Sequence, residues 1–555
     1  MNKVKVHLGY LIFLIIISSC KNEAPTPETT YWTAYDETTQ LAENANHENP
    51  RMRYKLIQSY SLDKNTIWAD INKDLKDFSE DDYAELKSKI LENDIESLQQ
   101  QVTKGELSYE DITKFYLYRI RKLESDSLTT LHTVLALNTN AVSQAQEKDA
   151  NRPTDLPNAS IYGLPVLLKD NVNTKTMRTT AGAIALENNQ PKEDAYIVDR
   201  LKENGALILG KVNLSEWAYF FCSGCPVGYS AVGGQTLNPY GPKKFETGGS
   251  SAGSGTAMAA NYAVAAVGTE TAGSILSPSS QNSVVGLKPT VGTLSRTGIV
   301  PISSTLDTPG PMTRTVRDNL IFMQAMLGKD EQDKASSSST LLQPSELNPN
   351  AIKSKRLGAF KSLIENDSLY RNSIAILREN GVEVIEVEQP QVPLEGFLTL
   401  LNIDMREDLP VYLKQFSGDS VSIASVADVI KFNREDSLKR APYGQTLFNG
   451  IVSDTTSTTD FSAIKKKLHT NGRLFFDQLL EKHDLDGILS INNYHAAYAA
   501  VALYPALTVP MGYQENGEPK NLTFIASANS ENALYQMGYG FEQLTQYRKA
   551  PKGYE

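Results

Sequence analysis

The sequence predicts an α/β fold, a single large domain in which a mixed, mostly parallel β-sheet lies between helices on both faces. Short apolar runs typical of buried strands alternate with helical segments along most of the 555 residues. Residues 195–213 predict a helix, a glycine stop and a strand, and residues 356–390 predict a strand, a helix and a strand. With 40% hydrophobic and 21% charged residues, the chain has the composition of a globular protein with a large core.

The N-terminus predicts export. Basic residues precede the apolar run 8–17, which is too short to span a membrane, and small residues follow it. The ending ISSC resembles the signal peptide of a bacterial lipoprotein, which implies removal of residues 1–19 and lipidation of Cys20. Residues 20–31 are polar and rich in Pro and Thr, as in a tether. We therefore expect an exported protein of the bacterial cell envelope, lipid-anchored at Cys20. A plain secretory signal peptide is the alternative.

The part of the chain before the first expected strand is helical. Residues 32–94 show helical periodicity in pieces, which predicts a helical extension in front of a main domain that spans 95–555. Residues 107–124 predict an amphipathic helix that opens with Ser108 and has Asp111 three residues later, a pattern close to a capping box. A helical layer is therefore expected ahead of the sheet.

A short apolar run within residues 160–172 ends abruptly in Lys169, Asp170 and Asn171. A buried strand that ends in polar residues is a common way to present a site at a sheet edge. We therefore expect these three side chains at the edge of the sheet.

Two clusters of glycine and serine, GGSS and AGSI, lie near the two ends of residues 246–275. Between them, SSAGSGTAMAAN predicts a tightly packed helix and YAVAAVGTE a buried strand, followed by a loop at residues 271–274. A helix followed by a strand folds the chain back on itself, so the two clusters are expected to lie together.

The C-terminal half continues the alternation. Residues 334–340 (KASSSST) predict a surface loop between the two halves, and residues from about 391 to 467 predict a less regular helical wall or lid over a cleft. Late strands are expected in DGILSINN, YPALTVPMGY and NLTFIAS, and a closing helix over 531–548.

Charge and motif content exclude several classes of function. The net charge of −11 argues against nucleic acid or an anionic membrane surface as the main partner. The motifs of zinc peptidases, α/β-hydrolases and P-loop proteins are absent. Cys222 and Cys225 form a C-x-x-C pair without a second pair or a nearby histidine, which favours a short structural disulfide or two unpaired thiols over zinc binding or redox catalysis. We expect neither a metal nor a cofactor.

Serine hydrolysis without a nearby histidine needs another base, and a lysine can serve when burial keeps it neutral. The chain contains GLPVLLKD with Lys169, GGSSAGS with Ser250 and GTETAGSI with Ser274, and the two serines are 24 residues apart. In order and spacing these three motifs resemble the amidase signature family. The resemblance extends over roughly residues 95 to 550.

The resemblance implies a Ser–Ser–Lys triad. Ser274 would attack the amide carbonyl and form an acyl-enzyme. Ser250, after a cis peptide bond from Gly249, would relay the proton, and Lys169 would be the neutral base. The oxyanion hole would be formed by the backbone N–H groups of Thr271, Ala272, Gly273 and Ser274. Three residues would orient the loop or the lysine, or else make simple structural hydrogen bonds: Asp170, Ser251 and Glu270.

Two departures from the family pattern bear on the substrate. Ala272 stands where many relatives have glycine, and its methyl group requires a negative φ. Leu276 and Ser277 stand where several relatives have an arginine that can bind a carboxylate, which favours a neutral or apolar acyl group. The segments NLSEWAYF and SRTGIVPIS are most similar to bacterial peptide amidases, which release ammonia from C-terminal amides. We expect an amidohydrolase that cleaves a small-molecule or peptide amide to a carboxylate and ammonia or an amine.

Two alternatives remain beside this hypothesis. One is a subunit resembling the A chain of glutamyl-tRNA amidotransferase, against which an export signal argues. The other is a binding lipoprotein that keeps the scaffold without catalysis, against which the intact triad argues. The sequence predicts neither the oligomeric state nor the redox state of the cysteines.

Overall fold

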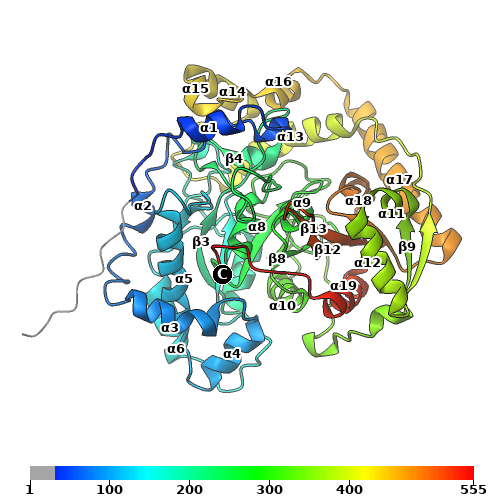
Figure 1. The fold of residues 1–555 in the computed structure, drawn as a ribbon. Helices are drawn as coiled ribbons and strands as arrows, with labels where there is room; N and C mark the ends of the chain where they lie inside the picture. Colours follow the sequence, from blue (N-terminus) through cyan, green and yellow to red (C-terminus); the bar gives the residue numbers. More distant parts are fainter. Residues whose placement is uncertain (1–31) are drawn as a thin grey trace, which may run out of the picture.

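The computed structural model describes residues 32–555 (Figure 1). The expected signal peptide (1–19), the tether (20–31) and the lipidation site Cys20 lie outside the described residues. Within residues 32–555, no helix combines the length and the apolar character that crossing a membrane requires.

A mixed sheet of eleven strands runs through the described part of the chain. In spatial order its strands are β1 (Val134–Leu137), β3 (Leu207–Val212), β2 (Pro165–Lys169), β6 (Ala265–Glu270), β8 (Thr308–Thr313), β7 (Val285–Lys288), β12 (Ala506–Tyr513), β13 (Pro519–Ile525), β11 (Gly487–Ile491), β9 (Arg356–Phe360) and β10 (Glu383–Val387). Parallel pairings form two blocks, β3–β2–β6 and β11–β9–β10. The strands between the blocks, and β1 at the edge, pair antiparallel. The expected α/β fold with a mixed sheet is confirmed, with its parallel pairings in these two blocks.

Helices cover both faces of the sheet. β6 and β8 are buried along their whole length, which requires cover on each side. One pair of helices, α8 (Ala252–Ala259) and α9 (Leu276–Gln281), packs together against the middle strands, and a second pair, α10 (Val316–Met326) and α19 (Glu531–Thr545), packs against β8 and β12 (Figure 1). Other helices around the sheet are α6 (Ala141–Ala150), α7 (Tyr196–Glu203), α11 (Lys361–Asn366), α12 (Ser368–Glu379) and α18 (Ala496–Ala502).

The N-terminal part is helical in short pieces joined by loops. Its helices are α1 (Thr38–Asn44), α2 (Asn65–Trp68), α3 (Glu80–Ile90), α4 (Ile95–Thr103) and α5 (Tyr109–Glu124). The predicted capping box opens α5, because Ser108 Oγ accepts a hydrogen bond from Asp111 N at 3.0 Å and the Asp111 carboxylate accepts one from Ser108 N at 2.9 Å. A local pattern of residues therefore sets the start of this helix.

Small residues let α8 approach its neighbours closely. A Cβ atom at Gly253 would lie 2.4 Å from the backbone oxygen of Asn213, and one at Gly255 would lie 2.8 Å from the backbone oxygen of Pro278. The glycine-rich sequence of this helix is thus a packing requirement. It allows the loops at the two ends of the α8–β6 unit to meet, as predicted.

The segment expected to form a helical wall or lid consists of helices and connecting loops. It contains α13 (Phe397–Phe416), α14 (Val426–Glu435), α15 (Ser437–Arg440), α16 (Thr446–Ser453) and the first part of α17 (Thr458–His483). Buried residues of α13, α14, α16 and α17 share a hydrophobic cluster with the loop that carries Cys222 and Cys225. This cluster is separate from the main core around the sheet.

Candidate active site

Lys169 is the last residue of β2, and its side chain is fully buried. Its Nζ donates to Ser250 Oγ at 2.8 Å, to Thr269 Oγ1 at 2.8 Å and to the Thr269 carbonyl at 3.1 Å. Burial lowers the pKa of Lys169 from 10.5 to about 7, while the carboxylates of Asp307 and Glu270 act in the opposite direction. Near neutral pH this lysine can therefore accept a proton.

Ser250 lies in the first glycine and serine cluster, and the peptide bond from Gly249 to Ser250 is cis, as expected. The Ser250 carbonyl accepts a hydrogen bond from Ser215 N at 3.0 Å. A Cβ atom at Gly249 would lie 2.6 Å from Ser215 Oγ, so the loop needs glycine at this position. These contacts keep the Ser250 hydroxyl within hydrogen-bond distance of the Lys169 amine.

The second cluster lies against the first, because Ser251 N donates to the Ser274 carbonyl at 3.2 Å. Ser274 is partly exposed, whereas Lys169 and Ser250 are buried. Gly273 has a φ of +93°, a conformation that favours glycine. Ala272 is not in this left-handed region, so its backbone meets the requirement for a negative φ that its methyl group imposes.

The loop presents a series of backbone N–H groups. Within residues 32–555, no protein acceptor is bound by the N–H groups of Thr271, Ala272, Gly273 or Ser274. The next two N–H groups, of Ile275 and Leu276, donate to Glu270 Oε2 at 2.6 and 2.9 Å. The arrangement can bind an oxyanion, since consecutive donors are left for a ligand while Glu270 fixes the residues after them.

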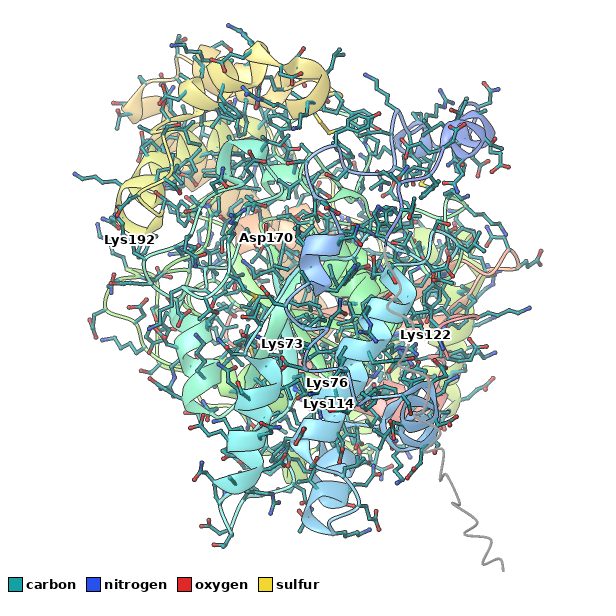
Figure 2. All side chains as sticks on the ribbon, turned by 90° about the vertical axis from the view of Figure 1, so that its left-hand side faces the viewer. Lys73, Lys76, Lys114, Lys122, Asp170 and Lys192 are labelled. Carbon is teal, nitrogen blue, oxygen red and sulfur yellow. A yellow bond between two sulfur atoms is a disulfide. The ribbon has the colours of Figure 1, made fainter. Side chains whose placement is uncertain are left out.

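The expected supporting residues take different places. Ser251 Oγ accepts from Thr269 N and donates to the Thr269 carbonyl, both at 3.1 Å, which ties the first loop to the end of β6. Glu270 fixes the backbone just after Ser274. Asp170, which Figure 2 labels, is buried and instead forms an ion pair with Lys211 at 3.0 Å. It makes no hydrogen bond to Lys169.

Asp170 also orients a loop amide, as the sequence analysis allowed. Its Oδ2 accepts a hydrogen bond from Thr180 N at 2.9 Å. Its contribution is therefore to the loop after β2 and to the neighbouring strand β3, which carries Lys211.

A cavity of about 220 Å³ lies at this edge of the sheet. Thr269, which holds Lys169, and Thr271 of the N–H loop both line it. The opposite side comes from α13, within the predicted wall or lid, through residues that include Asp408 and Tyr412. Lys169, Ser250 and Ser274 do not line the cavity themselves. Other lining residues include Asn171, Ala218, Arg296, Val300, Ile302, Ser303, Ser304, Asp307, Asp333, Val411 and Phe416.

Two residues of the site, Thr269 and Asp307, were not among the predicted ones, whereas Asn171 was expected at this edge of the sheet. Thr269 makes two hydrogen bonds to Lys169, and Asn171 Nδ2 donates to Thr269 Oγ1 at 3.0 Å. Asp307 Oδ1 accepts a hydrogen bond from Thr271 Oγ1 at 2.5 Å. Thr269 and Asn171 adjoin the motif residues in sequence, which is a usable signal. Asp307 lies in a loop that is distant from these motifs along the chain, and the residues around it did not mark it as part of the site.

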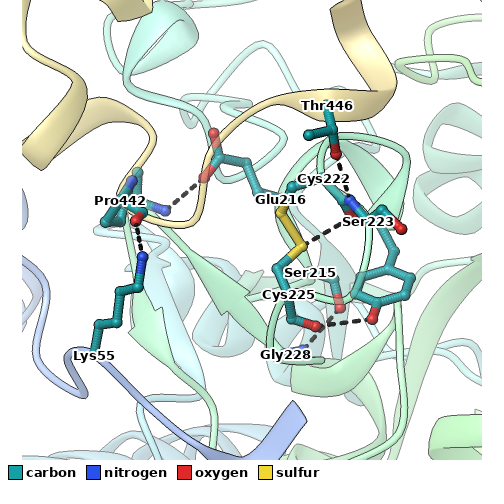
Figure 3. The surroundings of a disulfide bond; sticks show 11 residues. Lys55, Ser215, Glu216, Cys222, Ser223, Cys225, Gly228, Pro442 and Thr446 are labelled. Atoms are coloured by element: carbon teal, nitrogen blue, oxygen red, sulfur yellow. Dashed lines mark hydrogen bonds between the residues drawn. A yellow bond between two sulfur atoms is a disulfide. The ribbon is translucent and has the colours of Figure 1, made fainter. Parts of the chain in front are cut away.

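A disulfide joins Cys222 and Cys225, and neither residue lines the cavity (Figure 3). The loop contacts the helical wall, because Ser223 N donates to Thr446 Oγ1 at 2.9 Å (Figure 3). The preceding residues Trp217, Ala218 and Tyr219 all have positive φ, and Ala218 lines the cavity. The disulfide-bearing loop thus joins the cavity wall to α16.

The site combines a buried lysine that is hydrogen-bonded to a serine with free backbone N–H groups at a sheet edge. This combination is suited to serine-based hydrolysis of amides. The class defined by this fold and site is the amide-cleaving hydrolases. A family model described as Amidase matches residues 111–490, and the chain belongs to the amidase family. The protein is therefore an amide-hydrolysing enzyme.

Known proteins support this assignment over most of the chain. A probable amidase of Arabidopsis thaliana is 37% identical over 487 residues, which cover 83% of this chain and 92% of the relative. The crystal structure of an amidase family protein from Bacillus anthracis has a TM-score of 0.86 at 36% identity and covers 90% of this chain and 100% of its own. The peptide amidase from Stenotrophomonas maltophilia has a TM-score of 0.77 at 37% identity, covering 83% and 98%.

Proposed function

We propose that the protein hydrolyses a carboxylic amide through a serine acyl-enzyme, with Ser274 as nucleophile, Ser250 as proton relay and Lys169 as base. The observation that carries the proposal is the 2.8 Å separation of Lys169 Nζ and Ser250 Oγ in a fully buried setting, across which a neutral amine can accept the Ser250 hydroxyl hydrogen. Burial favours the neutral amine, which is the form that a base needs.

The proton of the nucleophile is transferred to the base through the two serine hydroxyls. Ser274 Oγ attacks the carbonyl carbon as its proton passes to Ser250, whose own proton passes to Lys169. The oxyanion accepts hydrogen bonds from the backbone N–H groups of residues 271–274. The lysine then returns a proton through Ser250 to the leaving nitrogen, the C–N bond breaks, and water hydrolyses the acyl-enzyme by the same route to give a carboxylate.

We propose a peptide C-terminal amide, or a small-molecule amide without a carboxylate beside the reacting carbonyl, as the substrate. The likeness to the Stenotrophomonas maltophilia peptide amidase supports this choice, and so does the absence of an arginine at Leu276 and Ser277. Release of ammonia from peptide amides, fatty amides and aryl amides tests it. Preference for fatty or aryl amides over peptide amides would reject the peptide assignment.

The test of the chemistry is covalent labelling by a fluorophosphonate, which reacts with an activated serine. We expect one label on Ser274 in the wild-type protein, and neither label nor amide hydrolysis in the folded Ser274→Ala variant. Lys169→Ala should lose hydrolysis as well. Absence of label in the wild type would favour a binding protein on the same scaffold, and full activity in either variant would reject the triad.

We propose that the mature protein is exported and held at a membrane of the cell envelope by lipid on Cys20. The signal-like sequence before Cys20 supports this, as does the Cys222–Cys225 disulfide, since disulfides persist in oxidising compartments. We expect labelled fatty acid in the wild-type protein and none after Cys20→Ala, with the variant released from the membrane fraction. An uncleaved protein in the cytosol with partner subunits would instead favour the amidotransferase alternative.

A further inference from the structure

Two carboxylates of the cavity wall are held by one loop. Asp307 Oδ2 accepts hydrogen bonds from Ile302 N at 2.8 Å and Ser303 N at 2.9 Å, and Asp408 Oδ2 accepts one from Ser304 N at 2.6 Å. Among residues 32–555, neither carboxylate forms an ion pair, and Asp408 Oδ1 has no hydrogen-bond donor. The cavity therefore has two carboxyl groups held in place on this side, and burial raises the pKa of Asp307.

The cations around the cavity compensate these charges only in part, because Arg296 attracts both Asp307 and Asp408 but forms its ion pair with Asp333. The Arg296 guanidinium lines the cavity but is bound to Asp333, with Nε 2.8 Å from Oδ2. Lys465 pairs with Asp404, the neighbouring carboxylate on α13, at 3.6 Å. Burial lowers the pKa of Lys169 to about 7, so this lysine is positively charged in only about half of the molecules at pH 7. The unpaired charge that faces the cavity is therefore negative.

Asp408 is the more accessible of the two carboxylates. Burial, together with the nearby carboxylates of Asp404 and Asp307, raises the pKa of Asp408 to about 6. At neutral pH it is mostly ionised against this repulsion. A cation placed beside it would relieve the repulsion and would gain a charge-assisted hydrogen bond.

A buried amide oxygen provides a second, independent acceptor. Asn171 lines the same cavity and is 2% exposed, and its Nδ2 is bound to Thr269 Oγ1. Its Oδ1 is buried with no hydrogen-bond partner within the described part of the chain. Since a buried acceptor without a donor is unfavourable, Asn171 Oδ1 indicates a ligand that brings N–H groups.

We infer that the cavity binds a positively charged nitrogen group of the substrate, an ammonium or a guanidinium, with Asp408 as its counter-ion and Asn171 Oδ1 as a further acceptor. The inference rests on the proposed amide hydrolysis and specifies its substrate class as amides whose acyl part carries a cation. The same wall repels a carboxylate at this place.

Two pairs of amides that differ in one charge test the inference. Alaninamide and N-acetylalaninamide place the charge near the amide, and N-acetyl-lysinamide and N-acetylnorleucinamide place it at the end of a side chain. In the wild-type protein we expect kcat/KM to be at least about tenfold higher for the cationic member of one pair, the range of one hydrogen bond to a charged group. Equal values in both pairs would overturn the inference.

The variant Asp408→Asn keeps an oxygen for Ser304 N and removes the charge. We expect it to bring the ratio of kcat/KM for the cationic amide to kcat/KM for its neutral partner down to about one. Glu407→Gln is the matched control, because Glu407 is exposed on the same helix and does not line the cavity. A preference that survives Asp408→Asn, or that Glu407→Gln also abolishes, would overturn the inference.

Calorimetric binding to the Ser274→Ala variant separates this inference from the proposed chemistry. We expect this variant to bind the preferred cationic amide at least about tenfold more tightly than its neutral partner, and Asp408→Asn in the same background to remove the difference. If no amide is hydrolysed by the wild type but this difference is found, the chemistry fails and the cation site stands. If binding shows no difference, the cation site fails whatever the activity.

Discussion

The acid limb of the pH profile is the most direct test of the Lys169 site. A lysine with the ordinary pKa of 10.5 is neutral in about 0.03% of molecules at pH 7, whereas one with a pKa of about 7 is neutral in about half of them. The difference corresponds to about 5 kcal/mol, and burial is its principal cause. Because the neutral amine is the base, we expect kcat/KM to fall about tenfold per pH unit below pH 7.

The assay is ammonia release from a neutral amide below its KM, measured from pH 5 to 9. A neutral substrate is required because Asp408, whose pKa is raised to about 6, also faces the cavity. Asp307 is the first of the groups that raise the pKa of Lys169, so Asp307→Asn should move the limb to lower pH. The exposed control Glu407→Gln should leave it in place.

Two results would refute this reasoning. A profile that stays flat between pH 5.5 and 8.5 would show that Lys169 does not titrate in the catalytic step. A limb that moves to higher pH in Asp307→Asn would show that the Asp307 carboxylate does not stabilise the lysine ammonium. An altered rate with an unmoved limb would likewise contradict the electrostatic role given to Asp307.

The other predictions concern three supporting features. Glu270→Ala leaves two backbone N–H groups without their acceptor, so kcat should fall about tenfold to a hundredfold, whereas Glu270→Gln should retain most activity in steady-state kinetics. Thr269→Val removes one hydrogen bond from Lys169 and should lower kcat/KM about tenfold and slow fluorophosphonate labelling. Replacing Cys222 and Cys225 by serine should lower the free energy of unfolding in denaturant by about 2 kcal/mol, as expected for so short a loop.

Each of these predictions has a contradicting result. Equal loss in Glu270→Ala and Glu270→Gln would show that the charge matters more than the acceptor. Unchanged labelling in Thr269→Val would remove Thr269 from the set of groups that position Lys169. An unfolding free energy unaffected by the loss of both cysteines would show that the disulfide loop contributes nothing to stability.

Much of the fold followed from local patterns. The capping box at Ser108, the strand that ends at Lys169 and the helix–strand unit between the serine clusters depend on residues close together in sequence. The strands β7 and β8 were not predicted. The β8 sequence TPGPMT is rich in proline and glycine, which are uncommon in strands. These two strands carry the antiparallel middle of the sheet, where pairing depends on distant segments.

The sequence by itself predicted the amidase family, because the motifs around Lys169, Ser250 and Ser274 are short runs of residues whose types, order and spacing are visible without the fold. The tertiary structure decided which groups act on them. The depressed pKa of Lys169 exists only once the folded chain removes water around it, and the contact of Asp307 with the N–H loop joins segments 36 residues apart. The negative cavity wall likewise needs α13 to lie over the sheet edge, since long-range packing alone brings Asp408 to the site.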